Sequence, residues 1–322
     1  MLTTLENTVA SIKSGQRLIL AADESLLAKL PKGNWLGGTI PYFMDEKGGI
    51  MDRDRIFVRA VPDEIEEIRI KAYGQNELSG IPKDAYENGV SFIIIPATSQ
   101  CHIRYAQNAP DYPDFFLHPI IGWISGVHLD DLGKTKPKVF NGVDGSSYED
   151  AAIVLHGKLP ENLYANIGVV NVFEQGSDDV LTFEHEGFTV KDCFVNGTKK
   201  NFAAYIKEQK IDTRLPLVAD YSGALINISI QTVKSDSVDL YAPVFSGVRY
   251  QFAKELDSYM NQFDDALPKN ANPSFTCNCI LNYLYSELEG KETKGMYGPI
   301  TFGEIAYQLV NQTLVYLEIQ KK

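Results

Sequence analysis

The sequence predicts an α+β fold with two subdomains, in which mixed β-sheets are flanked by helices. Two observations lead to this prediction. Helix-like and strand-like segments alternate irregularly: residues 2–13 carry apolar residues at helical spacing, whereas residues 17–22 form a largely continuous apolar run. The polar, glycine-containing residues 174–179 then interrupt the succession. We therefore expect one domain over residues 1–178 and a second over residues 179–322.

The period of the apolar residues and the position of chain breakers predict the elements in order. Helices are expected at residues 2–13, 23–30, 63–73, 99–106, 200–210 and 252–267. Strands are expected at residues 17–22, 91–97, 215–233, 238–244 and 312–319, with further strands between residues 139 and 173. The segment 180–195 has the pattern of a β-hairpin that turns at Glu186 and Gly187.

A glycine pair marks the apolar, strand-like segment 33–44. Gly37 and Gly38 lie inside it and are followed by Thr39. Glycine in a strand indicates that another backbone or a ligand approaches closely. The three residues do not form a phosphate-binding loop, because the glycines lack the required spacing and no lysine precedes the threonine. We expect this segment to lie at a tight packing contact or at a binding site.

The composition is that of a globular protein with an acidic balance. The chain has 322 residues, 44% of them hydrophobic, and a formal net charge of -12, which disfavours nucleic acid or an anionic membrane as a partner. The N-terminal residues lack the order of a signal peptide, and no apolar run approaches the roughly 20 residues of a membrane-spanning helix. We expect a cytoplasmic protein with four free thiols, at Cys101, Cys193, Cys277 and Cys279.

The C-terminal fifty residues hold the chemically most distinctive features. Residues 274–285 are apolar, with two cysteines and two asparagines, and predict a buried strand that runs into a helical turn. Thr301 and Glu304 have the spacing of a capping box, in which the two side chains cap the start of a helix. Residues 312–319 then predict a final strand.

These C-terminal features resemble those of a known family. The cysteine-bearing segment is followed by a Tyr-Gly-Pro-x-Thr-x-Gly-Glu-Ile turn at residues 297–305 and by a closing Asn-x-Thr strand at residues 311–313. Their order and spacing resemble the C-terminal part of FIST domains, a family of intracellular signal-transduction sensors, and the Gly-Gly-Thr segment resembles their N-terminal part. The resemblance implies two FIST-like parts, a small-molecule ligand and a sensory role without turnover.

We expect the ligand to lie in a cleft shared by the two parts, where small residues and polar side chains occupy otherwise apolar segments. The residues expected to line it are Gly37, Gly38, Thr39, Tyr42, Cys277, Asn278, Asn282, Tyr283, Gly303 and Glu304. Many FIST domains carry an arginine soon after the cysteine, which would clamp a ligand carboxylate, but none follows Cys277 here. The expected pocket is therefore more neutral. Any output would pass through a separate signalling protein.

Three other readings of the same residues remain open. Cys277 with Glu304 or a histidine would suit a cysteine-dependent hydrolase, although free cysteines are usually buried and inert. Cys277 and Cys279 share one strand face, but the second ligand pair of a structural zinc site is absent from the sequence. Some FIST relatives bind haem through a histidine, which makes His102 and His118 the candidate axial ligands; no haem attachment motif is present.

Overall fold

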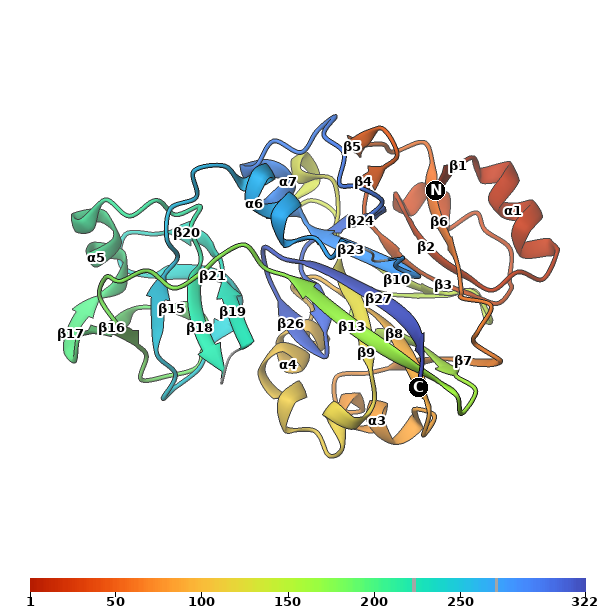
Figure 1. Ribbon diagram of the computed structural model, residues 1–322, viewed down its shortest axis with the longest axis horizontal. Helices are drawn as coiled ribbons and strands as arrows, with labels where there is room; N and C mark the ends of the chain where they lie inside the picture. Colours follow the sequence, from red (N-terminus) through yellow and green to blue (C-terminus); the bar gives the residue numbers. More distant parts are fainter. Residues whose placement is uncertain (222–223, 270–271) are drawn as a thin grey trace. The chain divides into compact units, whose positions relative to one another are not determined.

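The structure, a computed structural model, describes residues 1–221, 224–269 and 272–322. It confirms the predicted mixture of helices and mixed β-sheets (Figure 1). The chain divides into two compact units: residues 1–169, 268–309 and 314–322 form the first, and residues 170–267 and 310–313 form the second. This division differs from the predicted one, because most of the C-terminal segment pairs with strands of the N-terminal part.

The described residues of the first unit form three six-stranded sheets. The first sheet has the order β1 (Leu2–Thr3), β6 (Ile56–Ala60), β2 (Leu18–Ala22), β3 (Trp35–Thr39), β10 (Val139–Asn141) and β11 (Ser146–Tyr148). The second has the order β26 (Gln308–Val310), β25 (Glu304–Ala306), β9 (Ile120–Ser125), β8 (Gly89–Pro96), β12 (Ala152–Lys158) and β7 (Glu67–Tyr73). The third has the order β13 (Leu163–Val170), β27 (Leu314–Lys321), β23 (Phe275–Cys279), β24 (Gly298–Thr301), β4 (Tyr42–Asp45) and β5 (Gly48–Met51).

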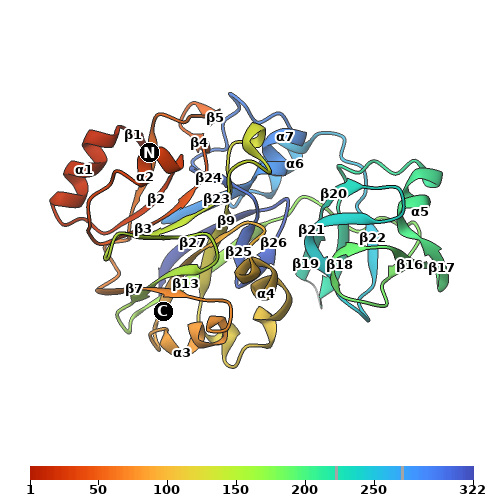
Figure 2. The ribbon, with the colours of Figure 1, turned by 180° about the vertical axis from the view of Figure 1, so that it is seen from behind.

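The helices in the described part of the first unit are short, and three of them begin at a polar cap. They are α1 (Leu5–Lys13), α2 (Glu24–Leu27), α3 (Ile81–Asp84), α4 (Gln100–Asn108) and α7 (Ile280–Tyr285). The side chains of Thr4, Asp23 and Ser99 accept the backbone N–H groups that would otherwise be unpaired at the starts of α1, α2 and α4. Helix α4 packs against β8. In both Figure 1 and Figure 2, α3 and α4 lie next to each other beside the sheet that contains β8.

In the described part of the first unit, parallel pairing joins β2 to β3, β8 to β9, and β23 to β24. The first two sheets pack face to face where Gly38 of β3 lies against Ile94 of β8. An added Cβ at Gly38 would lie 2.6 Å from Ile94 Cγ2 and 3.2 Å from Trp123 Nε1. The glycine pair thus marks a tight packing contact between strands, one of the two alternatives that the sequence left open.

The second unit contains two antiparallel sheets and two helices in its described residues. One sheet has the order β17 (Thr198–Asn201), β16 (Asp192–Val195), β14 (Leu181–Thr182), β22 (Tyr250–Phe252), β18 (Leu217–Tyr221) and β19 (Ala224–Ile228). The other has the order β15 (Gly187–Val190), β21 (Val238–Val244) and β20 (Ile230–Val233). The helices are α5 (Phe202–Gln209) and α6 (Tyr259–Ala266).

Most elements predicted as strands from continuous apolar runs are confirmed. The segments 17–22 and 91–97 are β2 and β8, the strand and helix expected in 274–285 are β23 and α7, and the final strand is β27. The expected helix at residues 99–106 is α4, and α1 and α2 are shorter than expected.

Four predictions of local structure are wrong. The expected helix at residues 63–73 is an edge strand, β7, in which partly buried and exposed residues alternate. The expected hairpin at residues 180–195 does not form, because β14 pairs with β16 and β22 whereas β15 pairs with β21. The segment 252–267 is helical only in α6, and β22 ends at Phe252. The capping box is absent, because Glu304 begins strand β25, which pairs with β9.

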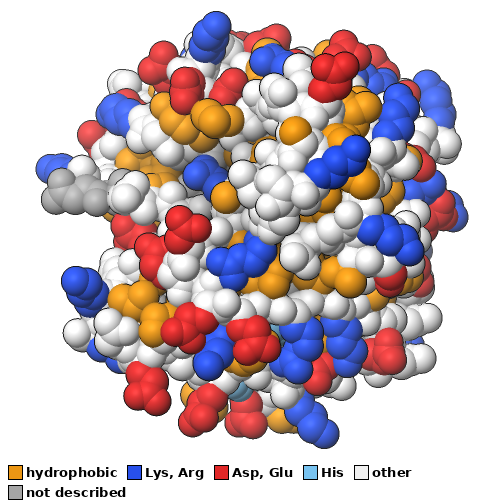
Figure 3. All heavy atoms as spheres, turned by 90° about the vertical axis from the view of Figure 1, so that its right-hand side faces the viewer, with side chains coloured by type: hydrophobic (Ala, Val, Ile, Leu, Met, Phe, Trp, Pro, Cys, Tyr) orange, Lys and Arg blue, Asp and Glu red, His pale blue; other side chains and the backbone are white. Residues whose placement is uncertain are grey.

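Charged side chains of both signs are interspersed over the molecular face in Figure 3, with smaller groups of hydrophobic side chains between them. None of the helices in the described part of the chain is long and apolar enough to cross a membrane.

Candidate functional site

An open cleft of about 290 Å³ lies in the first unit, at the carboxyl ends of β2, β3 and β9. Its walls come from α2 and the segments that follow these strands, and they combine charged, polar and small apolar side chains. The lining residues are Asp23, Glu24, Ser25, Ala28, Thr39, Ile40, Pro41, Arg53, Gly126, Val127, His128, Asp131, Thr135 and Lys136. The carboxyl end of parallel strands is a common location for ligand sites in α/β proteins.

The floor of the cleft forms where two of these strands end. The N–H of Gly126, directly after β9, donates a hydrogen bond of 2.7 Å to the carbonyl oxygen of Thr39, the last residue of β3. A Cβ at position 126 would lie 2.5 Å from the Phe302 ring. The absence of a side chain at Gly126 therefore allows the Phe302 ring to pack closely against the end of β9. The apolar residues Ile40, Pro41 and Val127 line the floor beside it.

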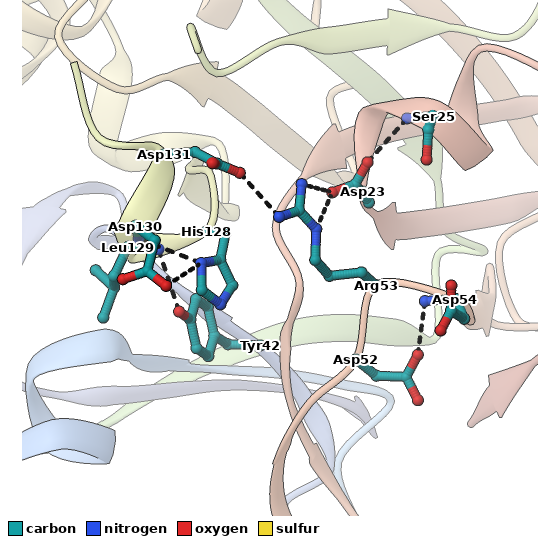
Figure 4. Close-up of polar contacts among 10 residues, drawn as sticks. All are labelled: Asp23, Ser25, Tyr42, Asp52, Arg53, Asp54, His128, Leu129, Asp130 and Asp131. Carbon is teal, nitrogen blue, oxygen red and sulfur yellow. Dashed lines mark hydrogen bonds and ion pairs between the residues drawn. The ribbon is translucent and has the colours of Figure 1, made fainter. Parts of the chain in front are cut away.

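Arg53 joins two sides of the cleft through its guanidinium group (Figure 4). Its Nε and one terminal nitrogen lie 2.9 and 2.8 Å from Asp23 Oδ2, and the other terminal nitrogen lies 2.9 Å from Asp131 Oδ2. Partial burial raises the pKa of Asp23, but hydrogen bonds from Ser25 and Arg53 outweigh that effect and hold the pKa below its usual value. Asp23 is therefore ionised at neutral pH and holds Arg53 in place.

An aromatic pair supports the segment that follows β9. The Tyr42 ring stacks on His128, with centroids 5.7 Å apart and planes 20° apart. The N–H of Leu129 donates to the Tyr42 hydroxyl oxygen at 3.2 Å, and the N–H of Asp130 donates to His128 Nδ1 at 3.2 Å (Figure 4). The Nδ1 atom of His128 thus acts as a hydrogen-bond acceptor for the turn that follows β9. Burial raises the pKa of Tyr42, so its hydroxyl stays protonated.

A second ion-pair group ties the same segment to α2. Lys138 Nζ lies 2.6 Å from Glu24 and 3.6 Å from Glu149, and Lys136 Nζ lies 3.2 Å from Glu149. The Thr39 hydroxyl accepts a 2.9 Å hydrogen bond from the Lys138 N–H. The cleft is therefore bounded by residues that both an ion-pair network and backbone contacts hold in place.

The structure places all ten predicted site residues in the first unit, and they fall into two groups. Of the N-terminal residues, Thr39 lines the cleft, Tyr42 supports His128, and Gly37 and Gly38 are packed inside β3. Tyr283 of α7 lies beside Tyr42, with ring centroids 5.7 Å apart.

The remaining predicted residues lie in or beside a buried polar cluster formed by β23, β24, β25 and α7. Asn282 Nδ2 donates to Asn278 Oδ1 at 2.9 Å, and the Thr301 hydroxyl lies 3.3 Å from the Asn278 carbonyl oxygen and 3.5 Å from Glu304 Oε1. Glu304 has no exposed surface, and Asn278 and Asn282 are also buried. Gly303 connects β24 to β25 and has a φ of 154°. The cluster brings predicted residues together inside the unit rather than at an open surface.

The thiol of Cys277 is buried next to this cluster. It donates a hydrogen bond of 3.2 Å to the carbonyl oxygen of Gly122, and the residue is 1% exposed. Its pKa is raised well above the usual value, mainly by burial and to a smaller extent by the negative charge of Glu304. The thiol is thus protonated at neutral pH, which is unfavourable for a nucleophile.

The two histidines considered for haem are not presented to a group of that size. His102 is 6% exposed, its Nδ1 accepts the N–H of Thr98, and burial lowers its pKa to about 4. His118 lines a cavity of only about 10 Å³, roughly the space of one water molecule. Across residues 1–221, 224–269 and 272–322, no group of three or more histidine, cysteine or acidic residues is arranged to hold a metal ion.

Five charged residues of the cleft were not predicted from the sequence. They are Asp23, Glu24, Arg53, Asp131 and Lys136. For Asp23 a signal existed, because a carboxylate directly follows the predicted strand at residues 17–22. Arg53 and Asp131 come from polar loops that are far apart in sequence, and only the fold brings them together.

Fold and site define a mixed α/β protein with a polar cleft at the carboxyl ends of parallel strands. The chain belongs to a protein family described as a family of unknown function (DUF6976), whose model matches residues 3–320. No curated protein matches the chain.

Proposed function

We propose that this protein binds a small molecule in the cleft at the carboxyl ends of β2, β3 and β9, and that it acts as a sensory protein with a FIST-like architecture and without catalytic activity. The observation that carries the proposal is the cleft itself: it combines an apolar floor with converging charged groups from three separate segments. Such concave sites with a few fixed polar groups are typical of ligand binding. A separate signalling protein would receive the output.

The cysteine-dependent hydrolase receives less support from the geometry. The Cys277 thiol is 1% exposed and donates to a backbone carbonyl, and the neighbouring Glu304 charge disfavours the thiolate. A nucleophile needs access to substrate and a base that accepts its proton. Binding in the open cleft therefore remains the function that we propose.

The test uses one variant that fills the cleft and one matched control. Ala28 lines the cleft and is exposed, whereas the adjacent Lys29 is exposed and outside the lining. Full-length wild-type protein, Ala28→Trp and Lys29→Trp are purified from the host and compared by native mass spectrometry. We expect a compound of small mass on the wild type and on Lys29→Trp, and its loss from Ala28→Trp at an unchanged melting temperature. Equal retention by both variants would refute binding in this cleft.

A further inference from the structure

Carboxylates outnumber basic groups at the cleft. Three carboxylates line it, at Asp23, Glu24 and Asp131, together with two basic side chains, at Arg53 and Lys136. The ion-pair partners just outside the lining, Glu149 and Lys138, add one charge of each sign. These two residues form a group with Glu24 and Lys136 in which the charges balance, whereas the separate group of Arg53, Asp23 and Asp131 has one carboxylate in excess. An ion-pair network with one carboxylate in excess attracts a positively charged ligand and repels an anion.

Of the two carboxylates that pair with Arg53, Asp131 has the weaker pairing. Its Oδ2 lies 2.9 Å from Arg53, and within the described residues no donor contacts its Oδ1. By contrast, Asp23 accepts from two nitrogens of Arg53 and from the N–H of Ser25. The Asp131 side chain is 28% exposed, so a ligand can reach it. The excess negative charge is thus accessible at Asp131.

The position of Arg53 indicates which kind of group fits between these carboxylates. Its guanidinium lies between Asp23 and Asp131, while 46% of the side chain is exposed. The floor beside it is apolar, at Ile40, Pro41 and Val127. A cationic head would bind to the carboxylate, and a short apolar stem would cover this floor.

We propose that the ligand of the cleft is a monocation, an ammonium or guanidinium group on a short apolar stem, and that it binds to Asp131 in competition with Arg53. This inference rests on the proposed binding function and names its ligand class. Arg53 then determines specificity, because its bond to Asp131 must yield to the ligand.

The experiment compares probes that share one stem and differ in charge. Full-length protein is titrated calorimetrically at low ionic strength, where screening is weak, with n-butylguanidinium, n-butylammonium, butyrate and 1-butanol. We expect both cations to bind and butyrate to bind more weakly than either. Asp131→Asn is expected to raise the Kd of butylguanidinium about tenfold, as for the loss of a charged hydrogen-bond partner. The control Asp54→Asn alters an exposed carboxylate outside the cleft lining and should leave Kd unchanged.

The response to loss of Arg53 has opposite signs for the two charge classes. If the ligand is a cation, Arg53→Gln removes a competitor and tightens binding of butylguanidinium. If the ligand is an anion, the same change removes its partner and weakens binding of butyrate. The matched control is Arg55→Gln, because Arg55 also pairs with an aspartate, Asp52, but lies outside the cleft lining.

Two outcomes separate this inference from the proposed function. Tighter binding of butyrate than of the cations, or weaker cation binding by Arg53→Gln, overturns the monocation while the binding cleft stands. The monocation is also refuted, and the binding cleft supported, if the compound retained from the host is an anion that is lost from Ala28→Trp. If no probe binds and Ala28→Trp retains the same compound as the wild type, both the ligand class and the binding cleft are refuted.

Discussion

Replacing Gly38 by alanine tests the packing of the two sheets beneath the cleft. The added Cβ would lie 2.6 Å from Ile94 Cγ2, about 1 Å closer than the usual carbon contact of about 3.5 to 4.0 Å. Ile94 has no exposed surface and its Cγ2 is fixed near the backbone, so the strands must move apart. Overpacking of this kind costs about 1 to 3 kcal/mol. We expect Gly38→Ala to lower the free energy of unfolding by that amount.

Intrinsic fluorescence during urea unfolding is a suitable assay. Both tryptophans of the chain, Trp35 and Trp123, are buried in the first unit, so the signal reports this unit. Gly80→Ala is the matched control, because nothing lies within 4 Å of its added Cβ. In this control, the free energy of unfolding should stay unchanged or increase by up to about 1 kcal/mol. If Gly38→Ala is as stable as Gly80→Ala, the close packing of β3 on β8 is refuted.

Two further predictions concern buried titratable groups. The Cys277 thiol is buried and has a raised pKa, so iodoacetamide at pH 8 should leave it unmodified in folded protein and alkylate it in urea. Peptide mass spectrometry measures the modification. Equal rates of alkylation in folded and unfolded protein would contradict the burial of this thiol. Burial and the charge of Arg69 lower the pKa of His156 to about 4, so the unfolded chain takes up this proton first as the pH falls below about 6.5. The protonation of this histidine in the unfolded chain should therefore lower the free energy of unfolding by about 3 kcal/mol between pH 6.5 and pH 4. The free energy of unfolding is measured by urea titration at each pH. As the pH falls, it should decrease less in His156→Gln than in the control His185→Gln, which alters an exposed histidine. An equal decrease in both variants would refute the role of His156 in this pH dependence.

The buried strands were predictable because their signal is local. Residues 17–22 and 91–97 are almost wholly apolar, and they form β2 and β8 with little or no exposed surface. Residues 67–73 alternate charged and apolar side chains, but acidic residues upstream extend the pattern toward helical spacing. The segment forms a strand because it pairs with β12, whose residues lie 79 to 91 positions further along the chain. Such long-range pairing is not encoded in the local pattern.

The Thr301 and Glu304 pair illustrates the same limit at the candidate site. Its spacing fits a capping box, yet Glu304 lies opposite Trp123 in a β-ladder between β25 and β9. The sequence identified Thr39 and Tyr42, because polar side chains stand out in an apolar segment. It did not identify Arg53 or Asp131, which lie in polar loops where charged residues are common. Their roles follow only from the meeting of the loops after β5 and β9.

The most direct test of ligand binding in this cleft is a structure of the full-length protein with the compound that it retains from its host. We expect the compound to lie against Ile40 and Val127, with its cationic group within hydrogen-bond distance of Asp131 and with Arg53 displaced from that carboxylate. A compound bound elsewhere in the protein, with the bond between Arg53 and Asp131 intact, would contradict the proposed site.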